Sequence, residues 1–277
     1  MTEFPVVVGV KNEQHSALRF AADASAARGV GLRVIHCVEL LSSSDAVSLV
    51  SDTWPAPGQE VLDRAKAFLE ATSAPPTANY LLVVDSPYAT LADEATEASL
   101  VVVGTDPESM LERFFSGRVT ERLLKHAVAP VAVVPDGSWP TASEGGVFVA
   151  VDARNSAAGP LRFAFDEAQR RGRQLHVVHV APVGVPFEEL DPMRAAVSEI
   201  LAGWSEQYPD VVVTRQFLFD EADDGCLRAS AEAEILVLGR SSHTDDFLPF
   251  AHPVLAQIAR HAHSPCIVVP SVEGEPS

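Results

Sequence analysis

The stretch from Gly104 to Thr120, GTDPESMLERFFSGRVT, combines residue types that hold phosphate groups in α/β proteins. It follows the apolar run SLVVV and leads into the amphipathic segment ERLLKHA, so we expect a buried strand, a loop and then a helix. Glycines let backbone N–H groups come close to an anion, and a helix N-terminus favours negative charge. Gly104 and Gly117 therefore indicate a phosphate site.

Other residues of the same stretch oppose that chemistry. Pro107 has no N–H to donate, and its ring restricts the preceding residue to extended conformations. Asp106 and Glu108 add negative charge where a phosphate would lie. Arg118 partly offsets this charge, because a guanidinium grips phosphate well. The balance favours the remnant of a nucleotide site over an intact one.

The sequence contains the same pattern twice. The segment ALRFAADASAARGVGLRVIHCV matches PLRFAFDEAQRRGRQLHVVHVA, and ERLLKHAVAPVAVVP matches LAQIARHAHSPCIVVP, in the same order along the chain. His36 pairs in this way with His179. Two domains are predicted, residues 1–138 and 145–277, joined by a linker rich in Pro, Gly and Ser.

Each half alternates strand-like and helix-like segments. The expected strands of the first half are apolar runs at residues 6–10, 32–38, 79–85, 100–104 and 130–135. The expected helices cover residues 16–28, 60–72, 86–98 and 117–127. Continuous apolar strands that alternate with helices predict an α/β fold, with a five-stranded, mainly parallel sheet and helices on both faces. Ser86 and Pro87 form a strong helix-start signal, and Gly29 a helix-end signal.

Two endings carry a family resemblance. The motif VVVGT…G…ERLLKHAVAPVAVVP of the first half resembles the universal stress protein family, and LVLGR…AQIARHAHSPCIVVP of the second half resembles it too. The likeness covers nearly the whole chain, so the sequence resembles a tandem universal stress protein. This implies two Rossmann-like domains and a tendency to dimerise. Members of the family fall into one class that binds ATP and one that does not.

The ATP-binding class has the signature Gly-x-x-Gly, nine residues, then Gly followed by Ser or Thr. In the first half Gly104 and Gly117 fit this signature, while Pro107 stands at the second glycine. Arg118 stands at the hydroxyl position, and Thr120 is close enough in sequence to supply a hydroxyl instead. The resemblance thus implies a degenerate phosphate loop.

An Asp after the first strand contacts adenine in the ATP-binding class. The first half has Lys11 at this position, whereas the second half retains Asp152. In the second half Gly239 fits the first glycine, but Pro253 stands at a later signature position. Neither half carries the full set of nucleotide-binding residues.

Composition excludes several classes of protein. The formal net charge of −18 disfavours nucleic acid as a partner. No membrane-length apolar run occurs, and no basic segment followed by an apolar run opens the sequence, so we expect a cytoplasmic protein. Cys37, Cys226 and Cys266 are widely spaced, which predicts buried reduced thiols rather than a metal site.

The sequence therefore predicts a non-catalytic stress-response protein with degenerate nucleotide sites, which acts through protein partners or its conformational state. We expect no resident cofactor, with ATP as the alternative. A second hypothesis is an ATP- or AMP-binding regulator. A third is a weak ATPase of the related adenine-nucleotide α-hydrolase class, although no catalytic set of residues is visible.

The last expected strand of each half bears on assembly. Residues 131–134 and 266–269 should lie at sheet edges, and exposed apolar edges invite pairing. In the family, the last strands of two domains commonly pair across a two-fold axis. The resemblance therefore implies an intramolecular pairing of the two domains, with a homodimer of the whole chain as a further expectation.

Overall fold

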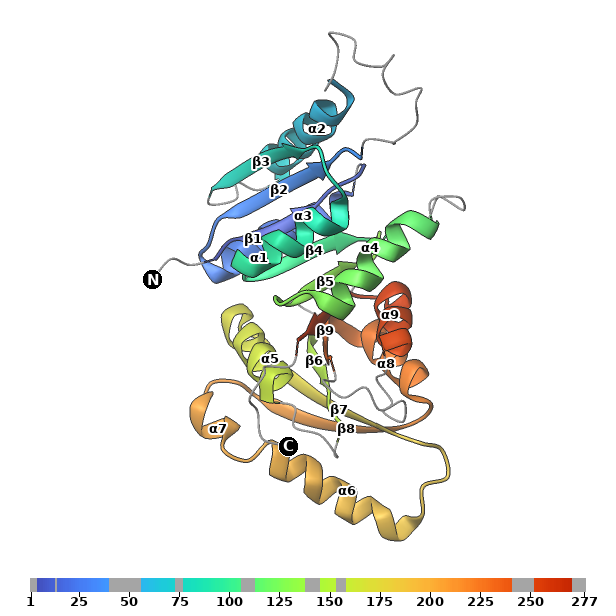
Figure 1. Ribbon diagram of the computed structural model, residues 1–277. Helices are drawn as coiled ribbons and strands as arrows, with labels where there is room; N and C mark the ends of the chain where they lie inside the picture. The colour runs from blue at the N-terminus through green and yellow to red at the C-terminus, as the bar shows by residue number, and fades with distance from the viewer. Residues whose placement is uncertain are drawn as a thin grey trace. The chain divides into compact units, whose positions relative to one another are not determined.

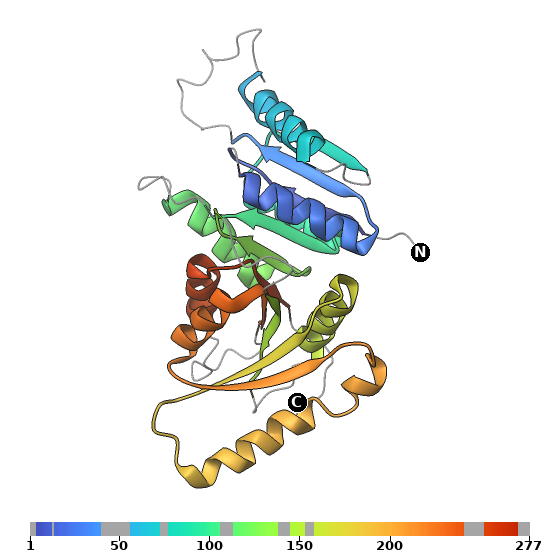
Figure 2. The ribbon, with the colours of Figure 1, turned by 180° about the vertical axis from the view of Figure 1, so that it is seen from behind.

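The computed structural model describes residues 4–12, 14–39, 56–72, 77–105, 113–137, 145–152, 158–240 and 252–270. The chain divides into two compact units, residues 1–137 and 138–277 (Figures 1 and 2). Each unit is an α/β domain built around five parallel strands.

Unit 1 contains five strands in the order β3-β2-β1-β4-β5, and every neighbouring pair is parallel. The strands are β1 (Val6–Gly9), β2 (Leu32–Cys37), β3 (Ala78–Val83), β4 (Leu100–Gly104) and β5 (Val131–Val134). The predicted fold class is confirmed for this unit. The chain leaves β1 for a helix on one face of the sheet and leaves β4 for a helix on the other, so a crevice opens between these connections at the carboxyl ends of the two strands.

Helices cover both faces of this sheet. They are α1 (His15–Arg28), α2 (Ala56–Thr72), α3 (Pro87–Glu94), a 3-10 turn (Ala95–Glu97) and α4 (Arg113–His126). Helices α1 and α2 pack together on one face, and α3 and α4 pack together on the other (Figures 1 and 2).

Unit 2 repeats this topology, with the strand order β10-β9-β6-β7-β8 and parallel neighbours throughout. Its strands are β6 (Gly146–Ala150), β7 (Leu175–Ala181), β8 (Val213–Phe219), β9 (Ala233–Gly239) and β10 (Cys266–Val269). Its helices are α5 (Ala158–Arg171), α6 (Phe187–Ile200), α7 (Trp204–Gln207), α8 (Ala222–Glu232) and α9 (His252–His261).

The inner strands β1 and β4 are continuous apolar runs because helices exclude water from both faces of the sheet there. Val6, Val7 and Val8 are fully buried in β1, as are Leu100 and Val101 in β4. Alternation of apolar and polar residues would expose one face, so the continuous runs are the signal of a doubly covered sheet.

Local signals place most helix ends. Gly29 ends α1 in the left-handed conformation at φ 69°, which only glycine adopts at little cost. Helix α3 begins at Pro87 after Ser86, as predicted, but the Ser86 side chain makes no capping hydrogen bond.

The start of α4 was predicted wrongly. The helix begins at Arg113 rather than Gly117, because the preceding segment RFFS contains no residue that breaks a helix. Gly117 therefore lies inside a helix and not in a loop, where its backbone N–H would be available to an anion.

A buried ionic network joins α5 to β9 in unit 2. Arg171 Nε donates to Glu167 Oε2 at 3.1 Å, and Arg171 Nη1 donates to Glu234 Oε1 at 3.1 Å. Arg173 Nε donates to the second oxygen of Glu234 at 2.9 Å. Glu167 is fully buried, and its charge is tolerated because Arg170 Nη1 and Arg171 Nε donate to its two carboxylate oxygens.

We expect Glu234→Gln to lower the free energy of unfolding of unit 2 by about 2 kcal/mol, because two charge-assisted hydrogen bonds lose their anion. The matched control Glu232→Gln, on an exposed neighbour in α8, should change it by less than about 0.5 kcal/mol. Urea denaturation followed by circular dichroism measures both. Equal effects of the two substitutions would show that the network does not stabilise the fold.

Candidate functional site

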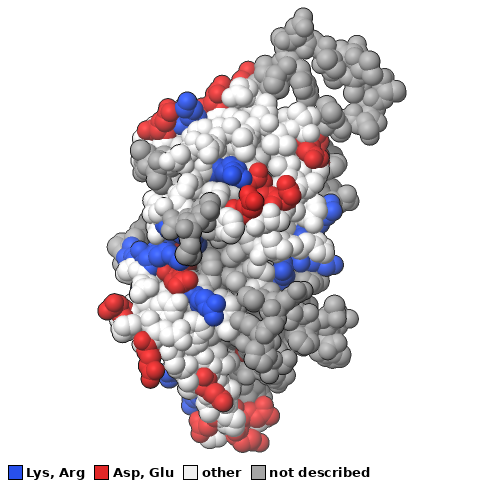
Figure 3. All heavy atoms as spheres, turned by 60° about the vertical axis from the view of Figure 1, so that its left-hand side comes forward, with Lys and Arg blue, Asp and Glu red and all other residues white. Residues whose placement is uncertain are grey.

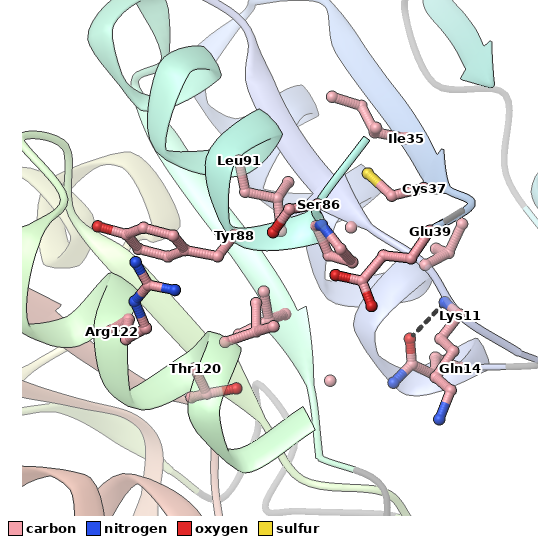
Figure 4. Close-up of a pocket in the computed structure, with 16 residues that line it drawn as sticks. Lys11, Gln14, Ile35, Cys37, Glu39, Ser86, Tyr88, Leu91, Thr120 and Arg122 are labelled. Carbon is pink, nitrogen blue, oxygen red and sulfur yellow. Dashed lines mark hydrogen bonds between the residues drawn. The ribbon is translucent and has the colours of Figure 1, made fainter. Parts of the chain in front are cut away.

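A cavity of about 340 Å³ lies at the carboxyl ends of β1, β2 and β4 in unit 1 (Figure 4). This is the crevice at the point where the strand order reverses between β1 and β4. The lining residues come from these strand ends, from the start of α1 and from α3 and α4: Gly9, Val10, Lys11, Gln14, Ile35, Cys37, Glu39, Ser86, Pro87, Tyr88, Leu91, Val103, Gly104, Val119, Thr120 and Arg122.

Two glycines allow the elements around the cavity to approach each other. A Cβ atom at Gly9 would lie 2.9 Å from Leu91 Cδ1, so glycine lets α3 sit directly on the end of β1. A Cβ atom at Gly104 would lie 3.0 Å from Gln14 Nε2. Gly104 thus serves the packing of the α1 start against β4.

The end of β1 is held by a histidine in both units. His36 Nδ1 donates to the carbonyl oxygen of Val10 at 2.8 Å, and His179 Nδ1 donates to that of Val151 at 2.9 Å. A carbonyl only accepts, so Nδ1 carries the proton in each case. The two histidines that match in the duplicated sequence thus make the same hydrogen bond. Each bond fixes the backbone of the residue just before Lys11 in unit 1 and just before Asp152 in unit 2.

Polar groups gather around the mouth of the unit 1 cavity, above an apolar floor. The carboxylate of Glu39 and the hydroxyls of Ser86 and Thr120 point toward the open space (Figure 4). The backbone N–H of Lys11 donates to Gln14 Oε1 at 3.2 Å, which ties the strand end to the start of α1. These groups provide donors and acceptors for a bound small molecule.

One wall of the cavity is an arginine stacked on a tyrosine. The guanidinium carbon of Arg122 lies 3.7 Å from the centre of the Tyr88 ring, which is cation–π geometry. Tyr88 comes from α3 and Arg122 from α4, so the stack bridges the two helices of this face (Figure 4).

Cys37 contributes a thiol to the cavity. Burial raises the pKa of this thiol, and a side-chain hydrogen bond with Thr90 opposes the rise. Burial raises the pKa of Cys226 much further, to about 12, and also raises the pKa of Cys266. All three cysteines are free, and Cys226 and Cys266 are fully buried. The expectation of buried thiols is therefore correct for two of them, while Cys37 is only partly buried.

The site residues that were predicted from the sequence lie in different elements of the structure. Gly104 and Thr120 line the cavity. Gly117 and Arg118 lie within α4, and the side chain of Arg118 is outside the described residues. In unit 2, Asp152 follows the end of β6 and Gly239 is the last residue of β9.

Five polar or aromatic residues of the cavity were not predicted as site residues from the sequence, namely Gln14, Glu39, Ser86, Tyr88 and Arg122. They come from four segments of the chain that only the fold brings together. A partial signal was available, because Ser86 and Tyr88 follow a predicted parallel strand, and side chains at such positions face the ligand crevice.

The corresponding region of unit 2 is packed differently. Val180 stands where unit 1 has Cys37, and a Cβ atom at Gly225 would lie only 2.6 Å from Val180 Cγ1. A Cβ atom at Gly239 would likewise lie 2.7 Å from Pro160 Cγ. Helices α8 and α5 thus press directly on the ends of β7 and β9. Burial lowers the pKa of Arg240, which follows Gly239.

The described surface carries charges of both signs. On the face drawn in Figure 3, basic and acidic side chains are interspersed, and the described residues of that face form no extended basic area. No helix among the described residues is both long and apolar enough to span a bilayer.

Comparison with known proteins gives consistent matches. The model of the universal stress protein family matches residues 4–135 and again residues 146–270. A universal stress protein of Mycobacterium tuberculosis strain H37Rv is 31% identical over 253 residues, which covers 84% of this chain and 86% of that protein. A second from the same strain is 29% identical over 286 residues, covering 92% and 93% respectively. In fold, the chain is similar to the crystal structure of a universal stress protein from Archaeoglobus fulgidus, with a TM-score of 0.71, 16% identity and coverage of 99% of this chain and 98% of that one.

The different burial of the three cysteines predicts which of them reacts with a thiol reagent in the native protein. We expect the native protein to react with Ellman's reagent at one thiol, Cys37, and more slowly than a free cysteine because its pKa is raised. The rate should increase with pH as the thiolate forms. Cys37→Ser should abolish the reaction, and denaturation should expose all three thiols. Rapid reaction of two or more thiols in the native protein would contradict the described burial.

Proposed function

The chain belongs to the universal stress protein family, and from this premise we propose that it is a non-catalytic stress-response protein whose unit 1 holds a small ligand in the cavity at the end of β1. In this proposal both nucleotide sites are degenerate, so the protein does not depend on bound ATP. It acts through its ligand-dependent conformation or through protein partners.

The position of Lys11 is the observation that carries this proposal. The resemblance places an adenine-contacting Asp directly after the first strand, and that is where Lys11 lines the cavity. An aspartate accepts a hydrogen bond from an exocyclic amine, whereas an ammonium group has only donors. The same amine would therefore meet a donor, and its recognition is lost.

The phosphate side of the site supports the same proposal. Pro107 lies outside the described residues, but it has no N–H wherever the loop runs. Arg118 replaces the hydroxyl residue of the signature, and Gly117 is part of a helix. Thr120 lines the cavity and has a hydroxyl close in sequence to the signature position.

The cavity residues also support the absence of catalysis. Among the described lining residues, Glu39 is the one carboxylate and Cys37 the one thiol. The raised pKa of Cys37 keeps this thiol protonated near neutral pH, which makes it a poor nucleophile. Binding is therefore better supported than a chemical step.

The alternative function is an ATP- or AMP-binding regulator. It is favoured by the cavity itself, because Gly104 and Thr120 from the signature region do line it. It requires Arg122, Arg118 or Thr120 to replace the lost phosphate donors.

The proposal includes an assembly. We propose that β5 and β10 pair within one chain, as the family resemblance implies. All residues of both strands are apolar or cysteine, which suits a strand covered on both sides. A homodimer of the whole chain is the further expectation, and sedimentation measures it.

Affinity for ATP tests the central part of the proposal. We expect the wild-type protein to bind ATP no more tightly than about 100 μM, because each lost charge-assisted hydrogen bond reduces affinity by about one to two powers of ten. The triple variant Lys11→Asp, Pro107→Gly, Arg118→Ser should bind ATP more tightly. Calorimetric titration measures both proteins.

Arg64→Gln is the matched control, since it also removes a positive charge but lies on α2, beside Glu60 and away from the cavity. This variant should bind ATP no differently from wild type. Low-micromolar binding by wild type would refute the proposal and support the nucleotide-regulator alternative.

Hydrogen exchange tests the assembly. Backbone amides alternate in direction along a strand, so an edge strand protects only every second amide. If β5 and β10 pair, the amides of Val131–Val134 and Cys266–Val269 should all exchange slowly. Fast exchange at alternate amides in both strands would rule the pairing out.

A further inference from the structure

The unit 1 cavity combines a small size, an apolar floor and a slight excess of positive charge. Its floor is formed by branched aliphatic side chains: Val10, Ile35, Leu91, Val103 and Val119. Its volume of about 340 Å³ is at the lower end of ligand pockets. An occupant must therefore be small and must have an apolar body.

The charged groups at the mouth determine the charge of this occupant. Two cations, Lys11 and Arg122, and one carboxylate, Glu39, line the cavity. In a chain with a net charge of −18, a local excess of positive charge stands out. Glu39 limits how much negative charge the site accepts, so the observations favour a ligand with a single negative charge.

The guanidinium of Arg122 is oriented to bind this negative charge. Among the described residues its guanidinium contacts the ring of Tyr88 and forms no ion pair with a carboxylate. The ring occupies one face of the guanidinium, so the N–H groups at its edge remain directed outward in one plane. A planar fork of this kind matches a carboxylate group, and the stack reduces the entropy lost when the ion pair forms.

We propose that the unit 1 cavity binds a small organic carboxylate, with its apolar body on the aliphatic floor and its carboxylate against the edge of Arg122. Tyr88 orients the guanidinium, and the hydroxyls of Ser86 and Thr120 lie within the same cavity to bind polar substituents (Figure 4). This inference rests on the proposed function, because it assigns a ligand class to a cavity that has lost its nucleotide contacts.

A phosphate monoester fits these observations less well. It carries about 1.5 to 2 negative charges near neutral pH, and a nucleoside triphosphate carries more. Glu39 at the mouth, and Asp106 and Glu108 in the neighbouring sequence, oppose such an anion. A carboxylate meets less of this repulsion.

The test compares acids with their neutral amides. Phenylacetate, hexanoate and indole-3-acetate would each be titrated into the full-length protein beside phenylacetamide, hexanamide and indole-3-acetamide. Calorimetry gives the affinities, and protection of Cys37 from Ellman's reagent reports binding in this cavity. At least one acid should bind and protect Cys37, about tenfold or more tightly than its amide. Added salt should reduce this preference, because the ion pair is partly exposed.

Variants assign the preference to Arg122. In Arg122→Gln the acid should bind no more tightly than its amide. Tyr88→Phe keeps an aromatic ring under the guanidinium and should retain the preference. Arg64→Gln, which removes a positive charge elsewhere in unit 1, should retain it too. Circular dichroism confirms that each variant is folded before titration.

Three results would overturn the proposal. The first is equal binding of acid and amide by wild type, or no binding of any acid up to about 10 mM. The second is an unchanged preference in Arg122→Gln. The third is protection of Cys37 by AMP at a lower concentration than by any acid. Only the third, if ATP also binds at low micromolar concentration, would overturn the proposed function as well.

Discussion

The parallel pairing of β1 with both β2 and β4 is the constraint on which the rest of unit 1 depends. Because all three strands run in one direction, their carboxyl ends meet at a single edge of the sheet. The chain leaves this edge toward opposite faces of the sheet after β1 and β4, which opens a crevice between the helices of the two faces. Every cavity residue reaches the site from this edge or from a helix that starts there.

The two units share this strand arrangement but differ in what lies at the carboxyl ends of the strands. In unit 1, Cys37 at the end of β2 lines an open cavity. In unit 2, Val180 at the same position packs closely against Gly225 of α8. Unit 2 instead has the network of Glu167, Arg171 and Glu234. Unit 1 keeps the arginine as Arg28 but has Ala24 and Ser99 in place of the two glutamates. The duplication has thus kept one fold, while a cavity lies at the strand ends of unit 1 and an internal ionic network stabilises unit 2.

Much of the fold could be predicted from the sequence because its signals are local. The apolar runs of β1 and β4, the Pro87 helix start and the Gly29 helix end all follow from short-range preferences. The role of His36 was also predictable, since a polar ring within an apolar strand must find a partner.

The site was harder to predict because its residues are distant in sequence. Nothing in the local sequence around Tyr88 indicates that Arg122 stacks on its ring, since the contact depends on the packing of α3 against α4. The α4 start was missed for a related reason. Gly117 resembles a helix boundary locally, but the segment RFFS before it contains no helix-breaking residue and the helix extends through it.

The proposed function requires that the protein use no resident nucleotide, and the nucleotide content of the purified protein tests this most directly. The absorbance ratio at 260 and 280 nm, followed by chromatography of the supernatant after denaturation, measures any adenine nucleotide carried by the chain. We predict that the protein purifies without stoichiometric ATP or AMP. One equivalent of adenine nucleotide per chain would contradict the account.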